Sequence, residues 1–191
     1  MAIGMYSASV PVYQRQLGAI SKILDKASAW ATAKKVDEGV LVGTRLIPDM
    51  LPLSRQVQIA CRFAEESMAR LAGAEIPKAP ENAEKTLGEL RGRIDAVLGY
   101  IKGFKADQIN GSDAREIVLT IGGNPLKLTG EQYLLHFAMA NFNFHCTTTH
   151  AILREAGVEI GKRDFIGGLS GLSALHTGGA NAPLASWRHG V

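Results

Sequence analysis

The chain has 191 residues, of which 46% are hydrophobic and 20% charged, and its formal net charge is +3. These values are typical of one folded globular domain with a substantial core. The basic residues are scattered, and no apolar run approaches the roughly 20 residues that span a bilayer, so neither a nucleic acid nor a membrane is expected as a partner.

The first predicted helix runs from Pro11 to Lys35. Ser7 or Ser9 can cap its start, and proline suits a first helical turn because its missing N–H would be unpaired there anyway. A second helical turn is expected at Asp37–Val42. Apolar residues recur along the first helix in steps of three and four, which is a heptad seam. They are Val10, Tyr13, Leu17, Ile20, Leu24, Ala27 and Ala31.

The next long helix is expected to take Asp49 as its N-cap, with Pro52 in the first turn, and to end at Gly73. A third long helix should start between residues 81 and 86 and end near Lys105. Its glycines lower its helix propensity and could mark close helix contacts. The two apolar stripes are Leu53, Val57, Ala60 or Cys61, Ala64, Met68 and Leu71, and then Leu87, Leu90, Ile94, Val97, Ile101 and Phe104.

A change of period follows, because Glu116–Ile121 and Leu126–Thr129 alternate as two short strands around a turn. The capping-box pattern T-G-E-Q then starts a last helix over Gly130–Ala156, which Gly157 ends. Its expected core residues are Tyr133, Leu134, Phe137, Phe144, Ala151 and Ile152.

Four helices with wide apolar stripes bury those stripes most simply against one another. The predicted fold class is therefore all-α, an antiparallel four-helix bundle with a short β-hairpin before its last helix. Residues 1–167 form this bundle, and residues 168–191 form a Gly/Ser/Ala-rich C-terminal tail. The tail either extends from the bundle or docks across a neighbour through its apolar residues, Leu169, Leu172, Leu175 and Trp187.

The two cysteines, Cys61 and Cys146, each lie inside an apolar helical pattern. Buried reduced thiols are the simpler interpretation, and they suit a reducing compartment. The opening segment MAIGMYSASVPVYQRQLG lacks the basic and apolar regions of a signal peptide. A cytoplasmic location is therefore expected.

Three segments, taken in this order, resemble a bacterial branch of unknown function in the DinB/YfiT-like superfamily: MYSASVPVYQRQL, RLIPDMLPLSRQVQIAC and LTIGGNPLKLTGEQYLLHFAMANFNFHCTTTHAILREAGVEIGKRDFIGG. The resemblance covers residues 2–167 and implies a four-helix bundle, often dimeric. Many proteins of the wider superfamily hold a divalent metal with three histidines, one on the second helix and an H-x-x-x-H pair on the last. Some use a small thiol as substrate or cofactor.

The histidines of the last predicted helix depart from that pattern. At about 100° per residue, His136 and His145 point to opposite sides, and His145 and His150 diverge by about 140°. His136 and His150 share a face but lie about 21 Å apart. No two of them can bind one metal as a pair four residues apart. The tail histidines, His176 and His189, could complete a site only by folding back.

The position four residues before His145 is Asn141, and the second long helix offers only Gln58 and Gln56 as polar candidates. One imidazole and two amides are a poor set for Zn²⁺ or Ni²⁺, so a divalent metal is disfavoured, and if one binds, His145 is the ligand. Gln58, Asn141, His145 and Thr149 are instead predicted to bind a small molecule between the two helices. The plainer interpretation is a core histidine satisfied by Asn141 or a threonine hydroxyl.

Three functions therefore stay open, and the cofactor is unknown. The first is a small molecule-binding bundle without the full tri-histidine metal site. The second is a divalent-metal-dependent transferase or hydrolase of the DinB type. The third is a non-catalytic homodimeric structural or interaction protein, with Tyr6, Phe142 and Trp187 at the contact. The sequence contains no G-x-S-x-G, P-loop, H-E-x-x-H or C-x-x-C motif, so whether the protein is an enzyme also stays open.

Overall fold

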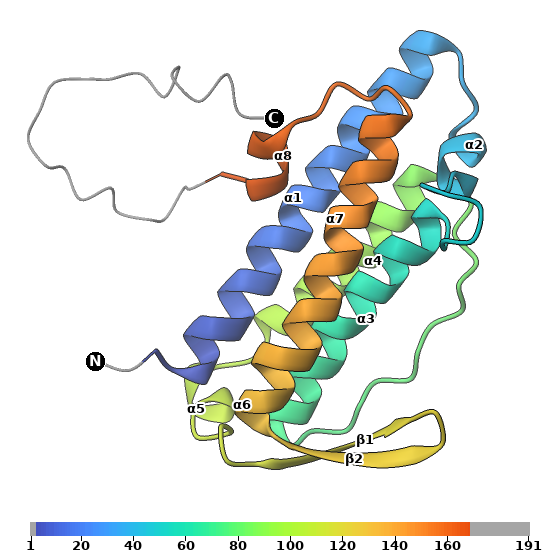
Figure 1. The fold of residues 1–191 in the computed structure, drawn as a ribbon. Coiled ribbons are helices and arrows are strands. Elements are labelled where there is room, and N and C mark those ends of the chain that lie inside the picture. The colour runs from blue at the N-terminus through green and yellow to red at the C-terminus, as the bar shows by residue number, and fades with distance from the viewer. Residues whose placement is uncertain (1–2, 169–191) are drawn as a thin grey trace, which may run out of the picture.

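The computed structural model describes residues 3–168, and it confirms the all-α bundle with a hairpin (Figure 1). Its four long helices are α1 (Met5–Lys34), α3 (Leu53–Ala72), α4 (Leu87–Lys102) and α7 (Met139–Glu155). The pairs α1–α4 and α3–α7 run antiparallel, whereas α3 and α4 run in the same direction (Figure 1). The parallel pair arises because the segment 74–86 returns along the whole length of the bundle before α4 begins.

The helix α1 begins at Met5, six residues before the predicted start at Pro11, which lies inside the helix. The expected caps are wrong, because Ser9 is buried and its Oγ donates to the carbonyl of Met5 at 2.6 Å. A distant residue satisfies the first turn instead, since the Tyr6 N–H donates to Asn110 Oδ1 at 3.0 Å. No local pattern in the sequence could have revealed this cap.

The connection between α1 and α3 holds the predicted helical turn, α2 (Glu38–Gly43), capped by Asp37, which accepts a hydrogen bond from Gly39 N at 2.6 Å. Asp49 is not the N-cap of α3, because the helix begins at Leu53 with Pro52 in the cap position. Gly73 ends α3 in the left-handed region at φ 67°, as a residue without a Cβ can.

The predicted apolar stripes of α1, α3 and α4 are buried, with the exception of Phe104, which lies beyond the end of α4 and is only partly buried. The glycines of α4 do not mark close helix contacts, because a Cβ added at Gly92 or Gly99 would meet nothing within 4 Å. The core therefore comes from the heptad-spaced side chains and not from close backbone approach.

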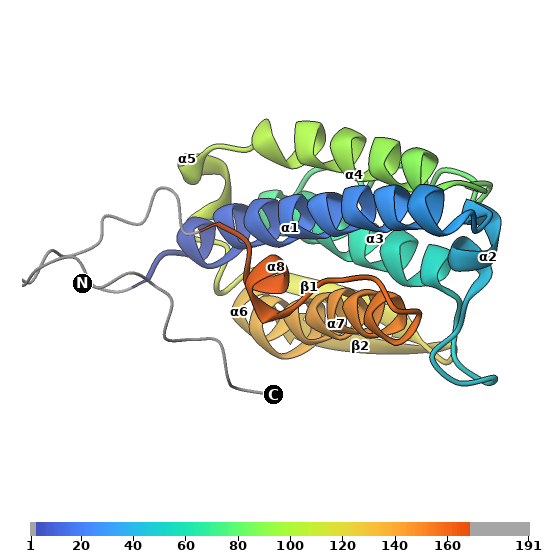
Figure 2. The ribbon, with the colours of Figure 1, turned by 90° about the horizontal axis from the view of Figure 1, so that it is seen from above.

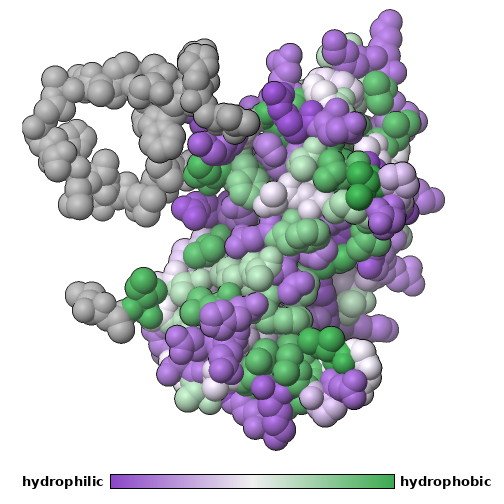
Figure 3. Space-filling view, in the orientation of Figure 1, coloured by the Kyte–Doolittle hydropathy of each residue, from purple (hydrophilic) through white to green (hydrophobic). Residues whose placement is uncertain are grey.

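A short helix, α5 (Ala106–Ile109), and the hairpin of β1 (Glu116–Ile121) and β2 (Asn124–Thr129) close one end of the bundle (Figure 1). The strands are antiparallel, with Glu116 opposite Thr129. On the face drawn in Figure 3, apolar side chains lie among polar ones and gather toward this end. The exposed apolar residues of the hairpin are Val118, Ile121 and Leu126.

The last long helix is not regular. The predicted capping box is present in α6 (Gly130–Gln132), where Thr129 Oγ1 accepts from Gln132 N at 3.3 Å. A π-helical segment, η1 (Tyr133–Ala138), then precedes α7. The wider π turn changes which side chains face inward, so Phe144, expected in the core, is 56% exposed. Phe142, expected at a dimer contact, is fully buried.

A final helix, α8 (Lys162–Ile166), packs against α1 (Figure 2). Lys26 Nζ lies 2.6 Å from Asp164 Oδ1, and Gln16 Nε2 donates to the carbonyl of Phe165 at 3.0 Å. No described helix is both long and apolar enough to cross a membrane. The tail residues singled out above, Leu169, Leu172, Leu175, His176, Trp187 and His189, lie outside the described residues.

Candidate functional site

A hydrogen bond between α3 and α7 defines the candidate site. His145 Nδ1 lies 2.7 Å from Gln56 Oε1, and Gln56 Nε2 donates to the carbonyl of Leu51 at 3.0 Å. Gln56 is buried and His145 is half-buried. The amide of Gln56 is therefore engaged at both ends, and it holds the imidazole in place.

These contacts also fix which nitrogen of His145 carries the proton. Only the amide NH₂ of Gln56 can donate to a carbonyl, so its oxygen must face His145, and His145 Nδ1 must be the donor. In the neutral imidazole, Nε2 then carries the lone pair. That Nε2 makes no hydrogen bond to another described residue, and it is not among the fully buried polar atoms.

Aromatic rings surround the imidazole. Phe63 of α3 stacks on His145 with centroids 6.2 Å apart and planes 18° apart, and Phe144 meets it edge-on at 5.3 Å. Phe137 continues the row, edge-on to Phe63 at 5.9 Å. Burial lowers the pKa of His145 below its usual value of 6.5. The imidazole is therefore neutral at pH 7 and presents an acceptor beside flat apolar surfaces.

The other predicted site residues of α7 hydrogen-bond to their own helix. Asn141 Nδ2 donates to the carbonyl of Phe137 at 2.8 Å, and Thr149 Oγ1 donates to that of His145 at 2.9 Å. Asn141 keeps its Oδ1 free of hydrogen bonds to the described residues. The hydroxyl of Thr149 thus satisfies a backbone carbonyl and does not complete a polar cluster around the imidazole.

Gln58 lies apart from this site. Its Oε1 accepts from Arg55 at 2.8 Å, and its Nε2 donates to Glu84 Oε2 at 2.8 Å, on the side of α3 that faces α4. Glu84 also pairs with Arg93 of α4. The structure therefore joins Gln56, and not Gln58, to His145.

Replacing Glu84 with glutamine should destabilise the protein by about 1–2 kcal/mol at pH 7, since charge-assisted hydrogen bonds are lost. Burial alone would raise the pKa of Glu84, but hydrogen bonds from Arg93 and Gln58, together with the arginine charge, hold it below 4.5. A carboxylate with a lowered pKa stabilises the fold above its unfolded pKa, and this contribution is lost as the pH falls through the folded pKa.

The difference in melting temperature between wild type and Glu84→Gln should therefore be full above about pH 5 and shrink toward pH 3. Glu116→Gln is the control, because Glu116 is exposed and its pair with Lys127 spans 3.3 Å at the surface. A difference that stays constant from pH 7 to pH 3 would show that the charge of Glu84 does not stabilise the fold.

The remaining histidines do not join His145. His136 is exposed on η1. His150 packs edge-on against Phe165 of α8 with ring centroids 5.7 Å apart, and its buried Nε2 has no partner among the described residues. No two of the three imidazoles therefore share a site.

The donor set does not fit the tri-histidine metal centre that the resemblance implies. His145 Nε2 is the one imidazole nitrogen there, Gln56 is used at both ends, and Asn141 offers a neutral oxygen. Zn²⁺ and Ni²⁺ take imidazole, thiolate or carboxylate ligands. Among residues 3–168, no three His, Cys, Asp or Glu side chains are grouped closely enough to hold a metal ion.

The cysteines do not supply a reactive thiolate. Cys61 and Cys146 are free and buried, as predicted. Burial raises the pKa of Cys61 to about 12 and holds that of Cys146 well above its usual value. Both thiols are therefore protonated at neutral pH.

Comparison with known proteins identifies a matching family and similar solved structures. The family described as "Domain of unknown function (DUF1993)" matches residues 5–166. The crystal structure of a DinB family member protein from Shewanella denitrificans is 38% identical, covers 93% of this chain and 95% of its own, and superposes with a TM-score of 0.78. No curated protein matches the chain.

Proposed function

The chain belongs to the DUF1993 family of DinB-like domains, and from this premise we propose that it binds a small molecule at His145, without a tri-histidine metal site. The proposal rests on the hydrogen bond from His145 Nδ1 to Gln56 Oε1, which leaves Nε2 as an acceptor. A ligand that suits this arrangement carries one O–H, N–H or S–H donor.

The rest of the ligand should be flat and apolar. Phe63 and Phe144 flank the imidazole, and Phe144 is largely exposed. Aromatic faces favour offset-stacked or edge-on rings, so a planar ligand body gains contact with both phenylalanines while its donor reaches Nε2. Asn141 Oδ1 is a second acceptor one helical turn away.

Phenol should bind at this site, and anisole, which has the same ring without the donor, should bind at least about tenfold more weakly, since one hydrogen bond to the imidazole is lost. NMR titration that follows the backbone resonances around residue 145, which the variants below also retain, measures both. Phenol affinity should also fall as the pH drops below 6.5, because protonation of His145 removes the lone pair, and burial places its folded-state pKa below that value.

The variants His145→Leu and Gln56→Met distinguish the role of the imidazole acceptor from the role of the amide that orients it. His145→Leu should abolish the preference for phenol over anisole, and Gln56→Met should reduce it, because Nδ1 loses its fixed partner. His136→Leu, at an exposed position before α7, is the matched control and should leave phenol binding unchanged. Equal affinities for phenol and anisole in the wild type would refute the proposal.

The two alternatives stay predictions. Stoichiometric metal in untagged protein that is lost in His145→Leu would favour the metal-dependent transferase or hydrolase over the present proposal. Of the residues expected at the homodimer contact, Phe142 is buried in the core and is not available, whereas Tyr6 is only partly buried and remains a candidate. Sedimentation at low concentration tests it.

A further inference from the structure

A second site lies on another face of α3. A cavity of about 450 Å³ that is partly open to solvent is bounded by α3, α4 and the segment 74–86. Its volume is in the range of small molecule pockets, roughly 300–1,000 Å³. The α3 residues that line it include Arg55, Ile59 and Arg62. Around the helix axis, Arg55 and Arg62 point about 100° or more away from Gln56, and Ile59 lies closer to Gln56, at the edge of the cavity.

Two arginines hold the segment 74–86 over this cavity through hydrogen bonds and an ion pair. Arg62 donates to the carbonyl of Pro77 at 2.7 Å and pairs with Glu65 at 2.9 Å. Arg93 of α4 pairs with Glu84 and donates to the carbonyl of Glu81. The cover of the cavity is thus tied to both helices beneath it, and the charges of these arginines are balanced by carboxylates.

Among the described residues, Arg55 is the arginine of the cavity without a carboxylate partner, and the acidic residue Glu81 also lines the cavity without an ion pair. Its guanidinium donates to Gln58 Oε1 at 2.8 Å and pairs with no carboxylate among the described residues. Gln58 is buried, and its Nε2 is held by Glu84 at 2.8 Å, so the amide fixes one edge of the guanidinium. The remaining N–H groups of Arg55 stay available to a ligand.

From this arrangement we infer that the cavity binds a small organic anion, with its carboxylate or phosphate on Arg55. A guanidinium offers a planar fork of donors that matches either head group, and such hydrogen bonds are stronger than neutral ones. The apolar wall of Ile59, Pro80 and Val97 suits a short hydrocarbon body beside that head group. This site is separate from His145 and does not depend on the proposal made for it.

Benzoate and phenyl phosphate are the probes that distinguish the two head groups, and benzamide is the neutral counterpart of benzoate. In an NMR titration, one of the two anions should shift the backbone resonances of residues 74–86 and of the α3 face around Arg55. Benzamide should bind on the order of tenfold more weakly, since the charge-assisted hydrogen bonds are lost. The tighter anion identifies the head group.

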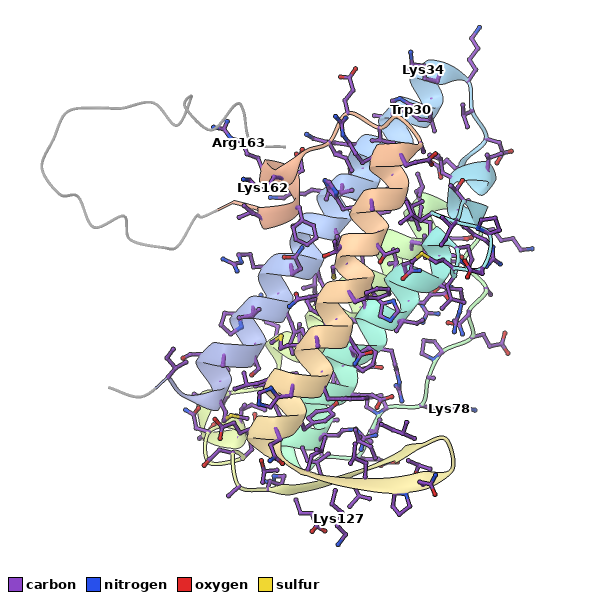
Figure 4. The ribbon with its side chains drawn as sticks, in the orientation of Figure 1. Trp30, Lys34, Lys78, Lys127, Lys162 and Arg163 are labelled. Carbon is purple, nitrogen blue, oxygen red and sulfur yellow. The ribbon has the colours of Figure 1, made fainter. Side chains whose placement is uncertain are left out.

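Arg55→Gln should lower the affinity for the tighter-binding anion by on the order of tenfold. Arg55→Lys should lower it less, because lysine keeps the positive charge but lacks the planar set of donors of the guanidinium. Lys78→Gln is the matched control. Lys78 is an exposed cation on the same segment, it does not line the cavity, and its side chain points away from the bundle (Figure 4). It should leave the affinity unchanged.

Three results would overturn the inference. The first is that neither anion shifts residues 74–86. The second is that benzoate, phenyl phosphate and benzamide bind equally. The third is that Arg55→Gln and Lys78→Gln reduce affinity to the same extent, which indicates a general charge effect and no specific contact. Melting curves of each variant confirm that it is folded before titration.

Discussion

Replacing Phe142 with alanine should lower the free energy of unfolding by about 3–5 kcal/mol, because it opens a cavity in a packed core. The ring of Phe142 is fully buried on α7 and meets Tyr13 of α1 edge-on, with centroids 4.7 Å apart and planes at 85°. The aromatic contact is lost together with the buried area. Chemical denaturation measures the change, and the melting temperature should fall by roughly 10 °C.

Phe144→Ala is the control for this prediction. It removes the same side chain from the same helix two residues later, but Phe144 is 56% exposed. Its effect on the free energy of unfolding should stay within about 0.5 kcal/mol, as is usual at surface positions. Equal losses in the two variants would mean that the π-helical segment does not set the inward face of α7 as described.

Gly130→Ala should destabilise the protein by about 3 kcal/mol, at the upper end of what overpacking usually costs. A Cβ at Gly130 would lie 1.9 Å from the backbone oxygen of Ser112, and no rotation of a side chain can relieve that clash. The two segments are also joined by a hydrogen bond from Glu131 N to the carbonyl of Asp113 at 3.0 Å. Either the turn or the start of the last helix must move.

The same substitution at Gly92 should have the opposite sign. Gly92 lies inside α4, where an added Cβ meets nothing within 4 Å. Alanine there should stabilise the protein by about 0.5–1 kcal/mol, because glycine loses more backbone freedom than alanine when a helix forms. Denaturation of both variants against wild type tests the pair. Effects of the same sign would contradict this account.

The sequence predicts those parts of the fold that local patterns control. Heptad spacing identified the buried faces of α1, α3 and α4, and the T-G-E-Q capping box identified where α6 begins. The sequence-based prediction is wrong where a residue far along the chain determines where a helix begins. The start of α1 depends on Asn110, more than a hundred positions along the chain, and no property of Ser7 or Ser9 reports it.

The candidate site shows the same division. Asn141 and His145 both lie in the regular part of α7, so their relation could be worked out by counting. Counting along the sequence could not show whether Gln56 or Gln58 contacts His145. Both flank the buried Val57, both are buried themselves, and one faces α7 while the other faces α4. Only the tertiary packing of α3 tells them apart.

The wide turn of η1 changes how this chain is to be aligned with other bundles. A helix that is α-helical throughout needs one residue fewer to carry the chain from Tyr133 to Met139. An ungapped alignment with such a relative would therefore shift α7 by one residue. Each side chain of α7 would then be matched to a residue that points to a different face of the relative's helix. Homologous histidines before and after the turn then require a single-residue gap between them before their geometries can be compared.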